Sequence, residues 1–207
     1  MRFLKWFALP ILIIFAPSLW ANSITINFEG LPEFTPVTTQ YPGVVFSNAI
    51  VLTAGSSLNE FEFPPHSGSN VVSDNGGAMS IMLTASATAF SGFFTYLAPL
   101  TLTAYDSLNN VVAVVHSTFS DNGASSGVPG SHPNELLSLN FAGGFSRITL
   151  TGDPSGGSFA LDDVTVTTPA PVPEPATLWL SGIGLLGLWL VRISRSRRLV
   201  VAAGFRP

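Results

Sequence analysis

The stretch 23-SITINFE-29 alternates between apolar and polar side chains along its whole length. Its apolar residues, Ile24, Ile26 and Phe28, fall on one face of an extended chain, and its polar residues fall on the other. Because successive side chains of a β-strand point to opposite faces, this alternation predicts a strand with one buried face. The stretch therefore indicates that a β-domain begins here.

Similar stretches recur as far as residue 167. They are rich in Val, Thr, Phe and Ile and are separated by clusters of Gly, Pro and Asn, whereas no useful length of helical periodicity occurs between residues 22 and 168. The turn 106-DSLNNVV-112 is expected to close a hairpin, since Asn tolerates positive φ. Further strands are expected at Val44–Thr53, Ser69–Ser73, Ala78–Ala87, Phe90–Tyr96, Leu100–Asp106, Val111–Phe119, Leu136–Phe141, Ser146–Thr151 and Phe159–Thr167. About eight to ten short strands predict an all-β fold, an antiparallel β-sandwich of jelly-roll type.

The last of these strands, 159-FALDDVTV-166, contains a change of parity. Phe159 and Leu161 share one face of an extended chain, whereas Val164 and Val166 share the opposite one. Both pairs are expected in the core, so the pleat must slip between them. A β-bulge between the two pairs is the simplest way to achieve this.

That bulge would fall on the adjacent carboxylates of Asp162 and Asp163, which repel each other unless a cation or N–H donors lie beside them. Calcium, which takes six to eight oxygen ligands, is one solution. Backbone N–H groups or water are the other. Glu29 is the expected third member of the cluster, because the first and last strands of such sandwiches are often neighbours.

Charge is distributed unevenly over the 207 residues, which include no cysteine. Between residues 22 and 168, Arg147 is the only Lys or Arg, against eleven acidic residues, a net charge of −10 with neutral histidines. Phosphate binding depends on clustered Lys and Arg, so this composition argues against a nucleic-acid partner. Without disulfides, the domain must be stabilised by its core, and it is long enough to bury a substantial one. The acidic residues are Glu29, Glu33, Glu60, Glu62, Asp74, Asp106, Asp121, Glu135, Asp153, Asp162 and Asp163.

Catalytic motifs are not found in this segment. Its histidines, His66, His116 and His132, have no metal-ligand spacing, and no serine lies in a G-x-S-x-G elbow. A hydrolase or lyase would have to use acids such as Glu60, Glu62 or Glu135. The sequence therefore favours a non-enzymatic protein.

The N-terminal residues 1–21 have the three-part layout of a secretory signal peptide: two basic residues, an apolar run and small residues. Ala21 provides the small residue for cleavage by signal peptidase before Asn22. An uncleaved membrane helix is the alternative, but the apolar run is short for a span.

Three segments follow the domain, which is expected to end at residue 168. Residues 169–175 form a Pro-rich spacer, residues 176–192 an apolar segment expected to be a transmembrane helix, and residues 193–207 a basic cytoplasmic tail. Since positive residues stay on the cytoplasmic side, the domain is expected on the periplasmic side of the inner membrane. The basic cluster consists of Arg192, Arg195, Arg197 and Arg198.

The C-terminal segment 172-VPEPATLWLSGIGLLGLWLVRISRSRR-198, with Pro173, Glu174 and Pro175 ahead of the apolar run and the arginines after it, resembles the PEP-CTERM sorting signal of Gram-negative bacteria. The resemblance implies recognition by an exosortase, then processing and release towards the cell surface or the extracellular polysaccharide matrix. The chain continues slightly beyond the basic cluster, which is a small departure from the pattern.

The domain itself resembles, more loosely, the carbohydrate-binding-module-like β-sandwiches of exported bacterial proteins, through 27-NFEGLP-32 and 159-FALDDVTV-166. That resemblance implies that Glu29, Asp162 and Asp163 lie together, often at a structural calcium. We therefore expect an exported, non-enzymatic envelope or matrix protein that binds exopolysaccharide or is structural in a biofilm matrix. The alternatives are an exopolysaccharide-degrading hydrolase or lyase and a protein-binding surface adhesin.

Overall fold

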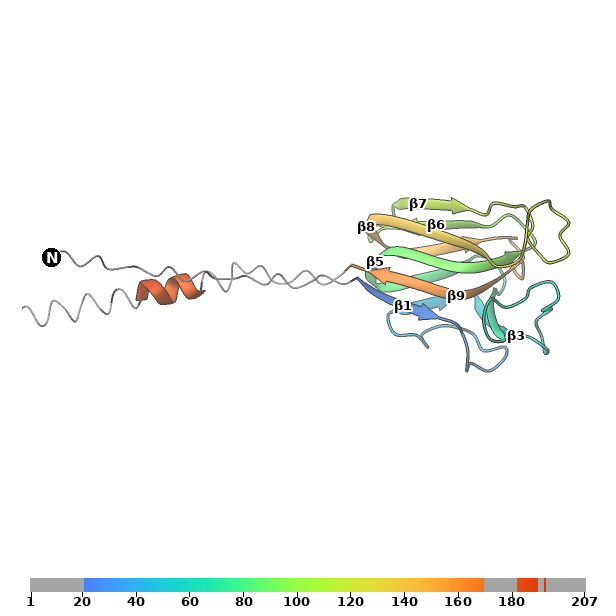
Figure 1. The fold of residues 1–207 in the computed structure, drawn as a ribbon, viewed down its shortest axis with the longest axis horizontal. Helices are drawn as coiled ribbons and strands as arrows, with labels where there is room; N and C mark the ends of the chain where they lie inside the picture. Colours follow the sequence, from blue (N-terminus) through green and yellow to red (C-terminus); the bar gives the residue numbers. More distant parts are fainter. Residues whose placement is uncertain (1–20, 170–181, 190–191, 193–207) are drawn as a thin grey trace, which may run out of the picture. The chain divides into compact units, whose positions relative to one another are not determined.

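The computed structural model describes residues 21–169, 182–189 and 192. Residues 21–169 belong to one compact unit, and residues 182–189 and 192 belong to a second unit. The first unit contains nine strands (Figure 1). They are β1 (Asn22–Ile26), β2 (Val44–Ser47), β3 (Ala49–Thr53), β4 (Asn70–Asp74), β5 (Met79–Tyr96), β6 (Thr101–Tyr105), β7 (Val111–His116), β8 (Glu135–Thr151) and β9 (Phe159–Thr168).

All pairs between these strands are antiparallel, and together they make two layers. The first sheet consists of β3, β4, β1, β9 and the halves of β5 and β8 that pair at residues 89–94 and 135–140. The second sheet consists of β2, β6, β7 and the other halves of β5 and β8. The expected antiparallel β-sandwich is therefore confirmed, and the jelly-roll topology stays a prediction.

The strands β5 and β8 are 18 and 17 residues long, and each serves both sheets. The sequence pattern predicted two separate strands in each case. The pairing of β5 with β8 shifts register between Met82 and Ala87 and again between Ala87 and Ala89, and such irregularities bend a strand without ending it. Conversely, the single strand expected at Val44–Thr53 is two, because Asn48 between β2 and β3 has a φ of 55°.

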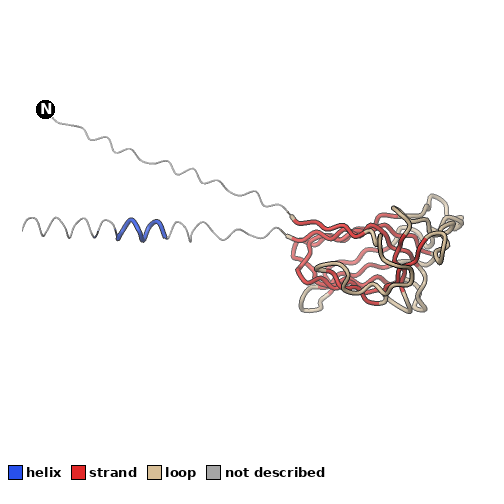
Figure 2. Tube along the Cα trace, turned by 90° about the horizontal axis from the view of Figure 1, so that it is seen from below, coloured by secondary structure: helices blue, strands red, loops and turns tan. Residues whose placement is uncertain are grey.

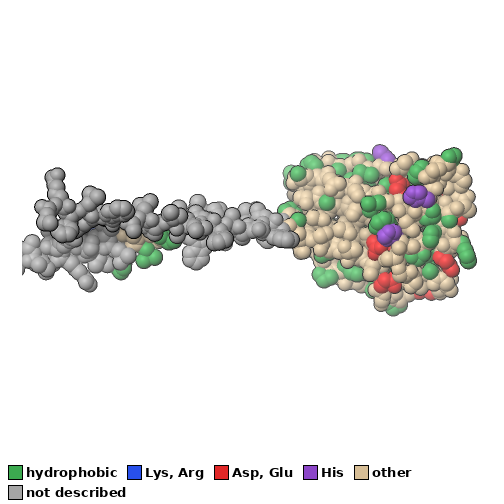
Figure 3. Space-filling view, in the orientation of Figure 1, with side chains coloured by type: hydrophobic (Ala, Val, Ile, Leu, Met, Phe, Trp, Pro, Cys, Tyr) green, Lys and Arg blue, Asp and Glu red, His purple; other side chains and the backbone are tan. Residues whose placement is uncertain are grey.

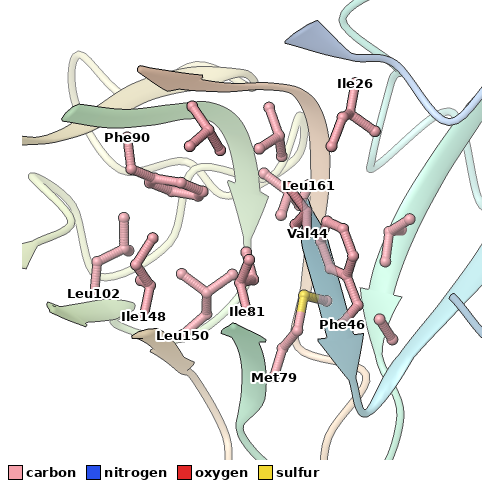
Figure 4. Close-up of a cluster of buried hydrophobic side chains, with 14 of the residues drawn as sticks. Ile26, Val44, Phe46, Met79, Ile81, Phe90, Leu102, Ile148, Leu150 and Leu161 are labelled. Carbon is pink, nitrogen blue, oxygen red and sulfur yellow. The ribbon is translucent and has the colours of Figure 1, made fainter. Parts of the chain in front are cut away.

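The core lies between the two layers and contains only residues of the β-domain. Apolar side chains from both sheets point towards one another, among them Phe46, Ile81, Phe90 and Leu161 (Figure 4). Ile26 and Phe28 are buried and Ile24 is partly buried against the core, which confirms the face predicted from 23-SITINFE-29. Among the described residues, this core consists of side chains from positions 24–166, so the domain has a core of its own, as independent folding requires.

Loops of the domain gather at the right-hand end of the view in Figure 2, whereas the strands fill the rest. The hairpin turn predicted at 106-DSLNNVV-112 joins β6 and β7, and Asn109 in it has a φ of 66°. Acidic and histidine side chains are also prominent in the right-hand half of the domain (Figure 3). Charged and histidine side chains are therefore found towards the loop end of the domain.

In the second unit, residues 182–189 are helical, with exposed apolar side chains such as Leu185 and Trp189. No helix among the described residues is long and apolar enough to cross a membrane. The expected signal peptide (1–21), all but Ala21, lies outside the described residues, as do the Pro-rich spacer beyond Pro169, the rest of the expected transmembrane segment and the basic tail.

Candidate glycan-binding face and its anchored loop

The three predicted acidic residues all contact one short segment, residues 66–70, which leads into β4. Glu29 follows β1, and its Oε1 accepts hydrogen bonds from the backbone N–H groups of Ser69 and Asn70, both at 2.8 Å. Gly68 makes this close approach possible, because its φ is +57° and a Cβ there would lie 2.3 Å from Glu29 Oε1. Glu29 therefore holds the segment against the end of the first strand.

Asp162 holds the same segment against β9. Its side chain is 1% exposed, and its carboxylate accepts hydrogen bonds from the N–H groups of Ser67 (2.8 Å) and Asp163 (2.7 Å). Burial raises the pKa of Asp162 to about 6, although the N–H donors oppose that rise and the charge of Asp163 adds to it. The carboxylate is thus a buried acceptor for the loop rather than a solvated surface charge.

Asp163 forms the bulge that the sequence predicted. On β5 only Gly92 separates Ser91 from Phe93, whereas two residues of β9 separate their partners, Thr165 and Asp162. Asp163 has a φ of 45°, a conformation that suits the extra residue of a bulge. The slip places Leu161 and Val164 both in the core, as their opposite parity required.

The bulge turns the Asp163 carboxylate towards the same loop segment. Its Oδ2 lies 2.6 Å from His66 Nδ1, and its Oδ1 accepts a hydrogen bond from the Ser67 hydroxyl at 3.0 Å. The His66 ring in turn stacks on Phe93, with ring centroids 3.4 Å apart and an interplanar angle of 9°. A flat pair of rings is therefore held at the surface of the first sheet, and the His66 side chain is 37% exposed.

Beside these rings lies the outer face of the first sheet, here called the hydroxyl face. The strand register aligns Thr25, Thr165, Ser91 and Ser138 in one row across β1, β9, β5 and β8. The next row is Ser23, Thr167, Ala89 and Asn140. Within these rows the side-chain oxygens of Thr25 and Thr165 are 3.2 Å apart, and those of Ser23 and Thr167 are 3.3 Å apart.

Hydroxyls both donate and accept hydrogen bonds, so each of these pairs keeps capacity for a further partner. Neighbouring strands are about 4.8 Å apart, so side chains of one row repeat at a regular spacing. None of the residues in the two rows is charged. Such an array matches an uncharged ligand that is itself rich in hydroxyls.

The acids considered for catalysis lie elsewhere and have structural partners. Glu135 accepts hydrogen bonds from the Tyr96 hydroxyl and from the N–H of Thr118, and burial followed by that first bond raises the pKa of Tyr96 to about 12. The Glu62 carboxylate accepts hydrogen bonds from the hydroxyl and the backbone N–H of Ser125. Glu60 is half-buried on the same loop as Glu62. Glu62 and Glu135 thus serve loop anchoring.

Calcium at Glu29, Asp162 and Asp163 stays a prediction. The contacts above are those of the alternative with N–H donors, and no group of three or more His, Cys, Asp or Glu side chains in the described ranges is placed to hold a metal ion. If calcium binds these carboxylates, it raises the melting temperature, and Asp162→Asn abolishes the rise. Equal melting temperatures in calcium and in chelator would contradict metal binding.

Sequence reasoning missed the partners of these acids. His66 has no metal-ligand spacing that would single it out, and Ser67 and Phe93 carried no signal of their own. The hydroxyl face, by contrast, has a sequence signal. The outward positions of 23-SITI-26, 137-LSLN-140 and 164-VTVT-167 are all Ser, Thr or Asn. Only the strand pairing shows that these positions form one surface.

Comparison with protein families identifies the C-terminal segment. Residues 171–198 match the PEP-CTERM protein-sorting motif, which confirms the resemblance drawn from Pro173, Glu174 and Pro175. This motif implies export and sorting to the cell envelope. The motif residues other than 182–189 and Arg192 lie outside the described part of the chain. No curated protein matches the chain.

Solved structures of similar architecture include adhesin and carbohydrate-binding domains. The K2 cleaved adhesin domain of Lys-gingipain is 13% identical at a TM-score of 0.48, over 71% of this chain and 100% of that one. The K1 cleaved adhesin domain of Lys-gingipain from Porphyromonas gingivalis W83 is 10% identical at a TM-score of 0.42, and the match covers 71% of this chain and 98% of that one. A carbohydrate-binding module of family 29 is 14% identical at a TM-score of 0.38, and the match covers 72% of this chain and 90% of that one. These similarities concern the fold alone.

Proposed function

We propose that this chain is an exported, non-enzymatic protein of the cell envelope or extracellular matrix, and that its domain binds polysaccharide through the hydroxyl face. The observation that carries the proposal is the pair of uncharged rows across β1, β9, β5 and β8. Sugars present several hydroxyls at once, and a regular array of Ser, Thr and Asn side chains can pair with them while the Phe93 ring provides an apolar contact.

The sorting motif supports polysaccharide binding outside the inner membrane. In the proposed route, signal peptidase removes residues 1–21, residues 176–192 hold the chain in the inner membrane with the domain on the periplasmic side, and an exosortase then acts at the segment that contains Pro173, Glu174 and Pro175. The domain would afterwards reach the cell surface or the biofilm matrix. We also keep the jelly-roll topology as part of the proposal.

A glycan array with residues 21–169 tests the binding. The test variant is Thr25→Val with Thr165→Val, which removes two hydroxyls from the β1–β9 end of the face without changing side-chain shape. Losing two hydrogen bonds of about 1 kcal/mol each predicts roughly a tenfold or greater loss of affinity. The control is Thr39→Val, in an exposed loop outside the face, which is expected to bind like the unchanged domain.

Two outcomes would overturn the proposal. If the domain binds no neutral glycan, polysaccharide binding by this face is wrong, and a structural role or a protein partner takes its place. If the domain instead degrades an exopolysaccharide, and Glu62→Gln or Glu135→Gln abolishes turnover, the protein is a hydrolase or lyase.

A further inference from the structure

The outer face of the second sheet differs from the hydroxyl face: it contains Arg147, the only Lys or Arg between residues 22 and 168. Its rows follow from the pairing of β2, β5, β8, β6 and β7. One row is Ser47, Ser80, Thr149, Thr103 and Val114; the next is Val45, Met82, Arg147, Tyr105 and Val111; the third is Thr151, Thr101 and His116. We call this surface the arginine face.

No carboxylate belongs to any of these three rows. The domain has eleven acidic residues, so a face without one is a local departure from its charge. Asp106 lies next to Tyr105, but its carboxylate accepts hydrogen bonds from the N–H groups of Leu108 and Asn110 and from the Asn110 side chain. Asp106 is therefore engaged in its own turn.

Arg147 makes no ion pair with any acidic residue in the part of the chain that the structure describes. Its guanidinium lies 3.7 Å from the centroid of the Tyr105 ring, and one terminal nitrogen donates a hydrogen bond to Asn109 Oδ1. Stacking on an aromatic ring fixes the plane of a guanidinium but leaves most of its five N–H donors for other acceptors. Arg147 is thus a positioned cation with no carboxylate at ion-pair distance in the described part of the chain.

We propose that the arginine face is a second glycan-binding surface and that Arg147 binds the carboxylate of an acidic sugar, a uronic acid. The planar guanidinium fork matches a carboxylate through two parallel hydrogen bonds. Thr103 and Thr149 lie in the adjacent row and can pair with the hydroxyls of the same sugar. Those flanking hydroxyls favour a sugar over an acidic protein side chain.

This inference rests on the proposed function only in taking glycans as the ligand class, since the two faces belong to different sheets. It also gives a reason for the single Arg of an acid-rich domain: a cation that forms no ion pair attracts an anionic substituent that the rest of the surface repels. A long polyanion would meet that repulsion, so the probe must be short.

The experiment measures binding of trigalacturonate to residues 21–169 by calorimetry. The test variant is Arg147→Gln, expected to weaken binding at least tenfold. Thr39→Glu, which changes the net charge equally but lies outside both faces, is expected to leave binding unchanged. Because Arg147→Gln also removes the contact with Tyr105, Arg147→Lys serves as a second variant. It keeps the charge but loses the fork, and is expected to bind more weakly than the unchanged domain.

Comparison ligands decide what Arg147 recognises. The methyl ester of trigalacturonate has no charge and is expected not to bind this face, and raised salt is expected to weaken the Arg147-dependent binding. Equal binding of the ester, or of trigalacturonate to Arg147→Gln, would overturn the proposal. A sulfated trisaccharide that binds as tightly as trigalacturonate would overturn the assignment to a carboxylate, and tighter binding of a polyglutamate peptide would assign the face to a protein partner.

Glycan binding by the hydroxyl face and by the arginine face can be contradicted independently of each other. If a neutral glycan binds and Thr25→Val with Thr165→Val abolishes that binding while trigalacturonate does not bind, the arginine face is wrong and the hydroxyl face stands. If trigalacturonate binding depends on Arg147 but no neutral glycan binds, the arginine face stands and the hydroxyl face is wrong.

Discussion

Asp162 illustrates how single residues in this domain exchange solvation for loop contacts. Its carboxylate is buried among the N–H groups of Ser67 and Asp163, and burial raises its pKa from about 3.8 to about 6. A carboxyl whose pKa is higher in the folded than in the unfolded chain favours folding when it is protonated. Its contribution is therefore fully present below about pH 4 and is lost as the pH rises through 6.

The first prediction concerns this loss of stability with rising pH. Between pH 4 and pH 7, Asp162 is expected to lower the free energy of unfolding by up to about 3 kcal/mol, and Asp162→Asn should flatten this fall. Urea denaturation at several pH values measures it. Burial raises the pKa of Asp74 as well, so some slope should remain. Asp106→Asn is the control, because the pKa of Asp106 is lowered by its bonds to Asn110. A slope unchanged by Asp162→Asn would contradict the prediction.

The second prediction concerns Gly68. A Cβ at this position would collide with the Glu29 carboxylate and would be strained at a φ of +57°. Gly30 has a φ of +80° but open space around it, so Gly30→Ala measures the strain alone. We expect Gly68→Ala to destabilise the domain by about 1–3 kcal/mol more than Gly30→Ala, because two N–H groups lose their acceptor. Equal effects in chemical denaturation would show that the Glu29 contact adds nothing.

Among the elements, β9 shows how one extra residue sets the faces of a whole strand. Phe159 and Leu161 before the bulge, and Val164 and Val166 after it, are all buried. The parity of these residues was enough to predict the bulge from sequence. The continuity of β5 and β8 was not predictable in the same way: Gly143 and Gly144 look like a turn within β8 when read alone, and the register shifts within β5 arise from its pairing with β8.

The third prediction tests the bulge. Deletion of Asp163 would move Val164 and Val166 to the outer face, so we expect a chain without cooperative thermal unfolding. Asp163→Gly keeps the extra residue and suits its positive φ, so this variant should fold with only a modest loss from the missing His66 and Ser67 contacts. Circular dichroism during heating distinguishes the two. A deletion variant with a normal transition would show that β9 can be re-registered.

For the whole molecule, the terminal segments and the domain have separate tasks. The domain completes its core within residues 24–166, and the matched sorting motif lies entirely beyond them. Targeting can therefore be altered without disturbing the fold. The acidic charge is likewise a property of the whole domain. It disfavours binding of nucleic acid, and it leaves Arg147 as the only Lys or Arg between residues 22 and 168 that can attract an anion.

The fourth prediction addresses sorting. Replacement of Pro173, Glu174 and Pro175 by alanine is expected to retain the protein in the inner-membrane fraction, while the domain keeps its melting temperature. In the unchanged protein, mass spectrometry of the mature form should find no peptide from Trp189 onward. Mature protein that still contains Trp189 and the arginine cluster would make the segment a plain membrane anchor.

The sequence by itself determined where extended chain occurs, though not every strand end. It also determined the bulge in β9, the Asn-containing hairpin turn and the sorting motif, because each depends on residues close together in the chain. Only the tertiary structure decided which loop the acidic residues bind and which hydroxyls share a face. His66 and Asp163 are 97 positions apart, and Thr25 and Thr165 are 140 apart. Contacts of that separation follow from strand order and register, and alternation within a strand contains no information about its neighbour.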